Sequence, residues 1–225
     1  MPRQRRPSSS GLIFHVVNRG AKRSVLFETA AEYDDFERLL QLATLRFEVA
    51  LFAYCLMPNH WHFVLSPSLS GALSKCMHWL TTTHARRWQL RRGAEGLGAV
   101  YQGRFRAIPI QGDRHFLWVC RYVERNALRA NLVSAAESWR WSSLWHRNEG
   151  DPAWFAEWPI TRGSNWLEVV NTPQTERELE DFRGAVIRGQ PFGSDDWKDC
   201  LTRAGVAPRA SRRPGRPRRQ DVLKK

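Results

Sequence analysis

The sequence has no apolar run near the roughly 18 residues that a membrane-spanning helix needs. Residues 1–10 are basic and polar, and they lack the apolar core of a secretory signal. The 4 cysteines are widely spaced in apolar contexts without a Cys-x-x-Cys pair, which argues against a disulfide framework or a zinc cluster. No nucleotide-binding loop and no strong internal repeat is visible. We therefore expect a reduced cytoplasmic protein without a membrane partner.

Positive charge is what the chain has in excess, with a formal net charge of +13. Residues 1–6 carry three arginines, and residues 203–225 carry nine lysines and arginines against one aspartate. Segment 86–129 holds ten arginines against three acidic residues, whereas segment 147–202 holds six basic and eleven acidic residues. Such segregation favours a polyanion as partner over a merely solvated basic surface. We expect nucleic acid, and hence association with the nucleoid.

Composition divides the chain into a basic tail at 1–10, a main domain at 11–146, an acidic extension with tryptophans at 147–202, and an Arg/Pro/Gly tail at 203–225. We expect the last tail to be disordered and to bind DNA. It resembles an AT-hook, but Pro214 interrupts the Arg-Gly-Arg-Pro core, so non-specific phosphate binding is favoured.

Hydrophobic periodicity predicts the order β-α-β-β-α-β-α in the main domain. The expected strands are 12–19, 47–56, a strand from 60 and 104–110, and the expected helices are 29–46, 70–92 and 113–128. Thr29 and Glu32 have the spacing of a capping box. The order matches an α+β, ferredoxin-like split βαβ fold, whose antiparallel sheet carries helices on one face and leaves the other open. Beyond it, we expect a mostly helical extension, with Ser194 capping the last helix.

The stretch from Met57 to Leu65 places two histidines around one bulky apolar residue. On a strand, His60 and His62 point to the same face while Trp61 packs on the other. Two adjacent imidazoles form half of a metal site, although a histidine in a strand is more often a satisfied polar residue. The pattern alone leaves metal binding open.

The helix at 113–128 carries a second polar set. Tyr122, Asn126 and Arg129 are spaced to lie along one ridge of it. Two imidazoles, the Asn126 amide oxygen and open positions suit Mn²⁺ or Mg²⁺ better than structural zinc. Tyr122 would then stand beside the metal, where nearby arginines at 121, 125 and 129 could favour its phenolate. Taken singly, Tyr122 is typical of a boundary tyrosine and Asn126 of an exposed polar residue.

Together these residues resemble a known family. Pro58-Asn59-His60-Trp61-His62 is similar to the His-hydrophobic-His motif of HUH endonucleases, and segment 122–133 resembles the tyrosine helix of single-tyrosine transposases. Over about residues 11–146 the chain most resembles the REP-associated tyrosine transposases. This resemblance implies Tyr122 as nucleophile, and His60, His62 and Asn126 as ligands of Mg²⁺ or Mn²⁺. The chain has Glu124 where relatives often have His or Asn, and Ala127 where proline is frequent, but neither change removes a catalytic group.

The resemblance also implies a function. The protein would be a metal-dependent endonuclease and transesterase that cleaves and rejoins single-stranded DNA at hairpins of repetitive extragenic palindromes. The intermediate would be a covalent 5′-phosphotyrosine, and the protein would be a monomer or weak dimer. The predicted DNA-binding residues are Asn18, Arg19, Lys22, Arg23, Arg86, Arg87, Arg104, Arg106, Arg125, Arg129, Arg213, Arg216 and Arg218.

Two alternatives stay open at this point. The first is a non-catalytic, sequence-specific binder or repressor of repeat DNA, which would be indifferent to a chelator. The second is a metal-dependent hydrolase of small phosphoesters, which would not need the basic tails. We also expect the acidic segment to fold over the DNA-binding face and restrain activity, so that deletion of 150–225 would raise nicking.

Overall fold

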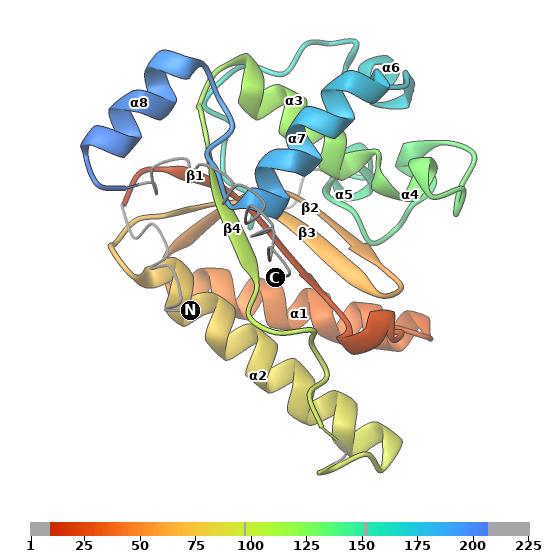
Figure 1. The fold of residues 1–225 in the computed structure, drawn as a ribbon. Helices are drawn as coiled ribbons and strands as arrows, with labels where there is room; N and C mark the ends of the chain where they lie inside the picture. Colours follow the sequence, from red (N-terminus) through yellow and green to blue (C-terminus); the bar gives the residue numbers. More distant parts are fainter. Residues whose placement is uncertain (1–9, 97, 151–152, 207–225) are drawn as a thin grey trace, which may run out of the picture.

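The computed structural model describes residues 10–96, 98–150 and 153–206. Four strands form one antiparallel sheet in the order β2-β3-β1-β4 (Figure 1). The strands are β1 (Ile13–Arg19), β2 (Val49–Met57), β3 (His60–Pro67) and β4 (Arg106–Ile110). With the helices between them, this order is the predicted ferredoxin-like arrangement, in which β3 is an inner strand.

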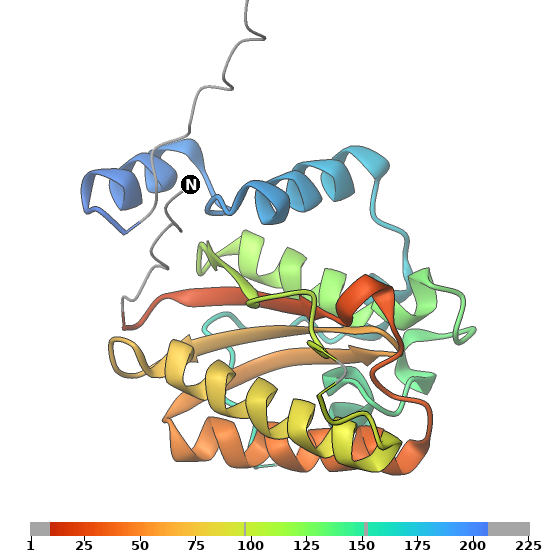
Figure 2. The ribbon, with the colours of Figure 1, turned by 60° about the horizontal axis from the view of Figure 1, so that its bottom comes forward.

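One face of the sheet is covered by α1 (Ala30–Arg46) and α2 (Ala72–Arg92), as predicted. Phe36 of α1 and Met77 of α2 are fully buried in one cluster with Trp61 and Phe63 of β3. Trp61 and Phe63 point to this face because alternate side chains of a strand share a face. Figure 2 shows both helices on the same side of the sheet.

The other face is also covered, which corrects the expectation that it would be open. Helix α3 (Arg114–Glu124) and helix α7 (Glu176–Arg188) lie over it (Figure 2). Val64 and Ile108 on this face are buried with Phe116 of α3 and Phe182 of α7. If this face were open, the side chains of Val64 and Ile108 would be exposed to water. Each Å² of apolar surface left in water would cost about 25 cal/mol. The sheet therefore has two cores.

Two of the predicted helices differ in detail from the prediction, one at its start and one near its end. Thr29 is the N-cap of α1, but its side chain makes no capping bond. The Glu32 carboxylate instead accepts the Glu28 backbone N–H at 2.7 Å and pairs with Arg92 at 2.7 Å, so no capping box forms. The predicted helix at 113–128 is divided, because Arg125 stands between α3 and α4 (Asn126–Arg129).

The C-terminal extension is mostly helical, as expected. Ser194 caps the last helix by accepting the Trp197 N–H at 3.4 Å. The acidic extension also contains the short helix α6 (Trp166–Asn171). No helix in the described ranges is long and apolar enough to cross a membrane. The remaining short elements are η1 (Ala21–Arg23), η2 (Ala136–Ser138), α5 (Ser143–Asn148) and α8 (Asp195–Arg203).

Candidate active site

The two histidines of β3 share one face of the sheet, as predicted. His60 lies opposite Arg19 of β1, and His62 lies opposite Val17. Trp61 points to the other face, where it is fully buried and its ring centroid lies 4.2 Å from that of Phe63. The strand thus separates a packing residue from two side chains that are available for chemistry.

A cavity of about 900 Å³ opens over these histidines. Its walls come from β1, β3, the loop before β4, the α3–α4 segment and α7. The four predicted catalytic and metal-binding residues all line it, together with several of the predicted DNA-binding residues; the lining includes His60, His62, Tyr122, Asn126, Asn18, Arg19, Arg104, Arg106 and Arg129. Helix α3 brings the tyrosine to the histidine strand across about sixty residues of sequence.

Tyr122 is held by rings on several sides. Its ring meets His62 edge-on at a centroid distance of 5.8 Å, and it meets Phe182 of α7 at 4.7 Å. Trp118, one turn earlier on α3, stacks on it at 5.7 Å. The side chain is only 6% exposed, so its position in the cavity is fixed by packing.

One arginine, not three, contacts the tyrosine ring. The guanidinium carbon of Arg129 lies 4.3 Å from the ring centroid of Tyr122. Arg121 and Arg125 point toward the segment before α7, where they donate to the backbone carbonyls of Thr172 at 2.8 Å and Asn171 at 3.4 Å. The positive charge next to the phenol therefore comes from Arg129.

Asn126 is almost fully buried and is bonded at both ends of its amide. Its Nδ2 donates to the Tyr122 carbonyl oxygen at 3.2 Å. Its Oδ1 accepts a short hydrogen bond from Arg129 Nη2. Asn126 lines the cavity, and the oxygen predicted to bind a metal is engaged by the Arg129 guanidinium.

The histidines of the site are neutral at pH 7. Burial, followed by the positive charges of Arg19 and Arg129, lowers the pKa of His60 to about 4. Burial and the neighbouring imidazoles hold the pKa of His62 well below its ordinary value. A neutral imidazole has the lone pair that a metal requires, so both rings are in the ligand form.

The donor set combines two imidazoles with an amide oxygen, since no group of three or more His, Cys, Asp or Glu side chains in the described ranges is arranged to hold a metal ion. His60 Nδ1 lies 2.7 Å from Asn59 Oδ1, and His62 Nδ1 lies 2.8 Å from a ring nitrogen of His15. Because Nδ1 is engaged in each ring, Nε2 is the nitrogen that stays available to coordinate a metal. Two imidazole nitrogens and the Asn126 oxygen match the preference of Mn²⁺ or Mg²⁺ for a partly open, oxygen-containing site.

Several lining residues were missed by reasoning from the sequence, and three of them bear on the chemistry of the site. His15 of β1 contacts His62 directly, while Arg183 and Ile187 of α7 reach the cavity from the acidic segment. The only signal for His15 was its position in the first strand, because its contact with His62 depends on strand register. The α7 residues gave no motif at all.

Other predicted DNA-binding residues lie away from the cavity walls. Lys22 and Arg23 form the exposed end of η1, with left-handed φ values of 52° and 64°. Arg86 and Arg87 lie on α2, across the sheet from the cavity, and Arg87 pairs with Asp35 at 2.6 Å. The tail residues fall outside the described residues. The roles of all of these stay predictions; the tail positions concerned are Arg213, Arg216 and Arg218.

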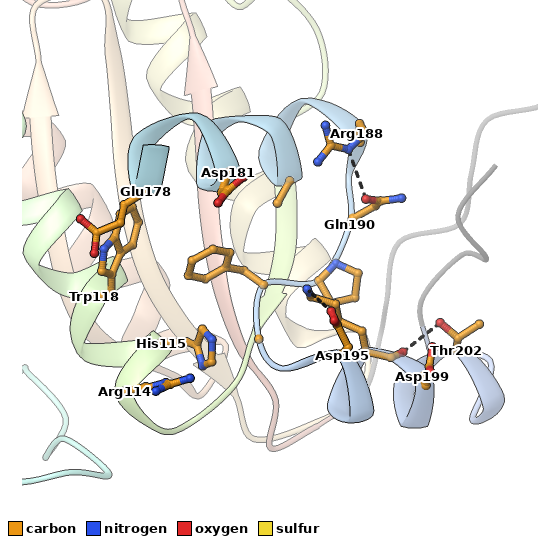
Figure 3. A pocket seen from close by; sticks show the side chains of 15 residues that line it. Arg114, His115, Trp118, Glu178, Asp181, Arg188, Gln190, Asp195, Asp199 and Thr202 are labelled. Atoms are coloured by element: carbon orange, nitrogen blue, oxygen red, sulfur yellow. Dashed lines mark hydrogen bonds and ion pairs between the residues drawn. The ribbon is translucent and has the colours of Figure 1, made fainter. Parts of the chain in front are cut away.

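A second cavity, of about 1000 Å³, lies between α3, α7 and α8 (Figure 3). Within it, Lys198 pairs with Asp195 at 3.0 Å and Arg188 donates to Gln190 at 3.2 Å. It holds neither a tyrosine nor a pair of strand histidines. The smaller cavity is therefore the better site for chemistry.

Comparisons with known proteins bear on the family and the fold of the chain. The family model described as "Transposase IS200 like" matches residues 8–126. A solved structure of a REP-associated tyrosine transposase bound to a REP hairpin has 18% identity and a TM-score of 0.54, covering 73% of this chain and 96% of that chain. A putative transposase from Deinococcus radiodurans R1 has 17% identity and a TM-score of 0.38, covering 55% of this chain and 96% of that one. No curated protein sequence matches.

The two stronger comparisons bear on different levels. The superposed structure confirms the predicted fold, because at this identity a structural likeness speaks for the fold alone. The family model spans more than half of the chain and includes His60, His62, Tyr122 and Asn126, which confirms the resemblance drawn from those residues. The chain belongs to the IS200-like transposase family.

Proposed function

We propose that this protein is a metal-dependent, REP-associated endonuclease and transesterase that cleaves and rejoins single-stranded DNA at palindrome hairpins. The observation that carries the proposal is the convergence of Tyr122, His62 and Arg129 in one cavity, with His60 and Asn126 in its wall. The hairpin in the similar solved structure supports the class of substrate. The arginines in the walls of the cavity support an anionic substrate.

Tyr122 is the nucleophile of the proposed reaction. Its Oη attacks the scissile phosphorus, forming an Oη–P bond as the P–O3′ bond breaks. The phenol proton leaves to solvent, and the departing 3′ oxygen takes a proton from water. The 5′ end stays on Tyr122 until a DNA 3′-OH attacks and restores the phosphodiester and the phenol. The bond energy is kept in the phosphotyrosine, so the reaction requires no ATP.

Arg129 is placed to hold the phosphate during attack. One arm of its guanidinium bonds Asn126 Oδ1, whereas Nη1 is buried and has no hydrogen-bond partner among the described residues. A buried charged donor without an acceptor is rare in folded proteins. A non-bridging phosphate oxygen above the Tyr122 ring would satisfy it and would orient the phosphorus toward the phenol.

His60, His62 and Asn126 would hold the divalent cation. When bound, it would supply Lewis-acid polarisation of the phosphodiester. The chain contributes two imidazoles that burial keeps neutral, and therefore ready to donate their lone pairs at physiological pH. The hydrogen bond that His60 Nδ1 donates to Asn59 Oδ1 fixes the orientation of the His60 ring.

The test is formation of a covalent protein–DNA adduct. Labelled hairpin DNA incubated with the protein and Mn²⁺ should give an adduct that survives denaturation, and chelation with EDTA should abolish it. Tyr122→Phe should form none while binding the hairpin with unchanged affinity. Tyr33→Phe is the matched control. Tyr33 of α1 stacks on Trp141 away from the cavity, and phenylalanine keeps this stacking.

Two outcomes would contradict the proposal. An adduct that persists in Tyr122→Phe would remove Tyr122 as the nucleophile. Tight hairpin binding that is indifferent to EDTA, without adduct or cleavage in the wild type, would instead support the non-catalytic binder of repeat DNA.

A further inference from the structure

His15 of β1 has no part in the proposed reaction, yet it is bonded to a residue that has. Its Nε2 lies 2.8 Å from Nδ1 of His62. The ring centroids are 5.1 Å apart and the planes differ by 24°. This geometry places the N···N contact near the plane of both rings, which is the direction of an imidazole lone pair. The contact is therefore a directed hydrogen bond rather than face-to-face stacking.

The His15 ring is fixed by its surroundings. The residue is 1% exposed and lies on β1 between Val64 of β3 and Ile108 of β4. The ring of Phe182 meets it edge-on from α7 at a centroid distance of 5.0 Å, and that of Tyr122 does so at 6.3 Å. A ring enclosed in this way holds its nitrogen at one place, and so it can orient a partner.

The hydrogen bond has two possible directions, and they differ in what His62 offers to the cavity. If His15 donates, His62 Nδ1 accepts, and the single proton of neutral His62 must lie on Nε2. If His62 donates, its Nε2 carries no proton and presents a lone pair. Only the second arrangement lets Nε2 of His62 bind a cation.

Packing alone does not account for a histidine at this position. Nδ1 of His15 is buried and has no hydrogen-bond partner among the described residues. An unsatisfied buried polar group costs about 1–3 kcal/mol, which an aliphatic residue of similar size would avoid. The histidine is therefore retained at a cost to stability, which indicates a role for its Nε2.

We propose that His15 is a positioning residue that accepts the His62 Nδ1–H and thereby selects the metal-binding tautomer and orientation of His62. The inference rests on the proposed function, because it concerns the cation that His60, His62 and Asn126 would hold. His15 itself touches neither the DNA nor the cation. Its effect is on the affinity for the metal.

The test measures Mn²⁺ affinity in the absence of DNA, by electron paramagnetic resonance of free Mn²⁺ and by calorimetry. His15→Leu removes the acceptor, and we expect it to weaken Mn²⁺ binding by about 10–100-fold, as loss of an outer-shell partner does. His15→Gln is the matched variant, because its amide oxygen can reach the position of Nε2. We expect it to bind Mn²⁺ within about threefold of wild type. Circular dichroism and hairpin binding without metal check that both variants fold.

Specific outcomes would overturn the role of His15. Wild-type Mn²⁺ affinity in His15→Leu would do so, and so would equal weakening in both variants, since the acceptor would then be irrelevant. If the wild type itself bound no Mn²⁺, the proposed metal-dependent function would fail instead.

A measurement on the wild-type protein keeps the inference testable if His15→Leu does not fold. Histidine side-chain ¹⁵N spectra with Zn²⁺ as a diamagnetic probe should show a proton on His62 Nδ1, with coupling across the hydrogen bond to His15 Nε2. A proton on His62 Nε2 in the Zn²⁺-loaded protein would contradict the proposal.

Discussion

Arg129 joins the predicted nucleophile to the predicted metal ligand. It lies over the Tyr122 ring, bonds the Asn126 oxygen and keeps Nη1 without a partner among the described residues. Arg129→Ala should lower the cleavage rate at saturating hairpin by about 10²–10³-fold, as loss of a transition-state donor does. Arg129→Lys should recover only part of this loss, because lysine lacks the planar fork of donors. Single-turnover cleavage with Mn²⁺ gives the rates.

Arg183→Ala is the control for Arg129, because this exposed arginine of α7 lines the same cavity. It removes the same charge, and we expect weaker hairpin binding with a cleavage rate within about threefold of wild type at saturation. Equal rate losses in both variants would mean that general charge, and not the Arg129 contact with the site, supports cleavage.

Local patterns reach some of the cavity residues and miss others. Strand alternation places His60 and His62 on one face, and helical spacing places Tyr122 and Asn126 on one ridge. Their roles in catalysis and metal binding came from the family resemblance and stay predictions. His15 meets His62 only because β1 pairs with β3 in one register, in which Val17 and not His15 lies opposite His62. A shift by one residue would turn His15 to the other face, and no local pattern fixes that register.

The order of the elements was predicted correctly, because the hydrophobic periodicity of a long segment shows whether it forms a helix or a strand. The break between α3 and α4 was not, since no glycine or proline marks it. Glu124, the last residue of α3, is fully buried and accepts hydrogen bonds from Ser143 at 2.7 Å and Trp166 at 2.8 Å. Arg147 pairs with it at 3.3 Å. These partners of Glu124 are distant in sequence, so no local pattern could predict them. They also show how the structure accommodates a glutamate at a position where related sequences often have histidine or asparagine.

Helix α7 is part of the second core, and Phe182 anchors it. Phe182 is fully buried against His15 and Tyr122. Phe182→Ala should lower the free energy of unfolding by about 3–5 kcal/mol, through lost burial and the cavity that remains. Ile187→Ala, on the same helix but 70% exposed, should change it by less than about 0.5 kcal/mol. Urea unfolding measures both, and a loss below about 1 kcal/mol in Phe182→Ala would show that α7 docks only loosely.

This packing changes the expectation for deleting residues 150–225. The acidic segment does fold over the cavity face, since Arg183 and Ile187 line the cavity. However, the deletion would also remove Phe182 and uncover the apolar side of α3. We expect the shortened chain to be destabilised, so nicking by it would not report on restraint alone.

Across the whole molecule, charge counts overstate the basic surface. Arg87 near the end of α2 was predicted to bind DNA, yet Arg87 and Arg91 both pair with Asp35 of α1 at 2.6 Å. Arg92 pairs with Glu32 at 2.7 Å. Composition cannot tell which arginines are already neutralised by a neighbouring helix, because the pairs join residues more than fifty positions apart. The cavity rim keeps exposed arginines, at 104 and 106.

Both cores also bury neutral histidines, and this sets how the fold responds to acid. Burial lowers the pKa of His15 to about 3 and that of His60 to about 4 on the cavity face. On the α1–α2 face, burial lowers the pKa of His84 to about 3. In the unfolded chain these side chains return to about 6.5. At pH values between the folded and unfolded pKa, these histidines bind a proton in the unfolded state but not in the folded state.

The sign of the pH dependence follows. Above pH 6.5 these groups are neutral in both states and leave the stability unchanged. As pH falls from about 6.5 toward 4, each should lower the free energy of unfolding by about 1.4 kcal/mol per pH unit. Urea unfolding from pH 7.5 to 4.5 should show this fall. In His84→Asn the fall should be shallower by one histidine's share, and His78→Asn, at an exposed position of the same helix, controls for the change from histidine to asparagine itself. Equal slopes in all three proteins would mean that His84 takes up its proton in the folded state, and that the core around it opens before the molecule unfolds.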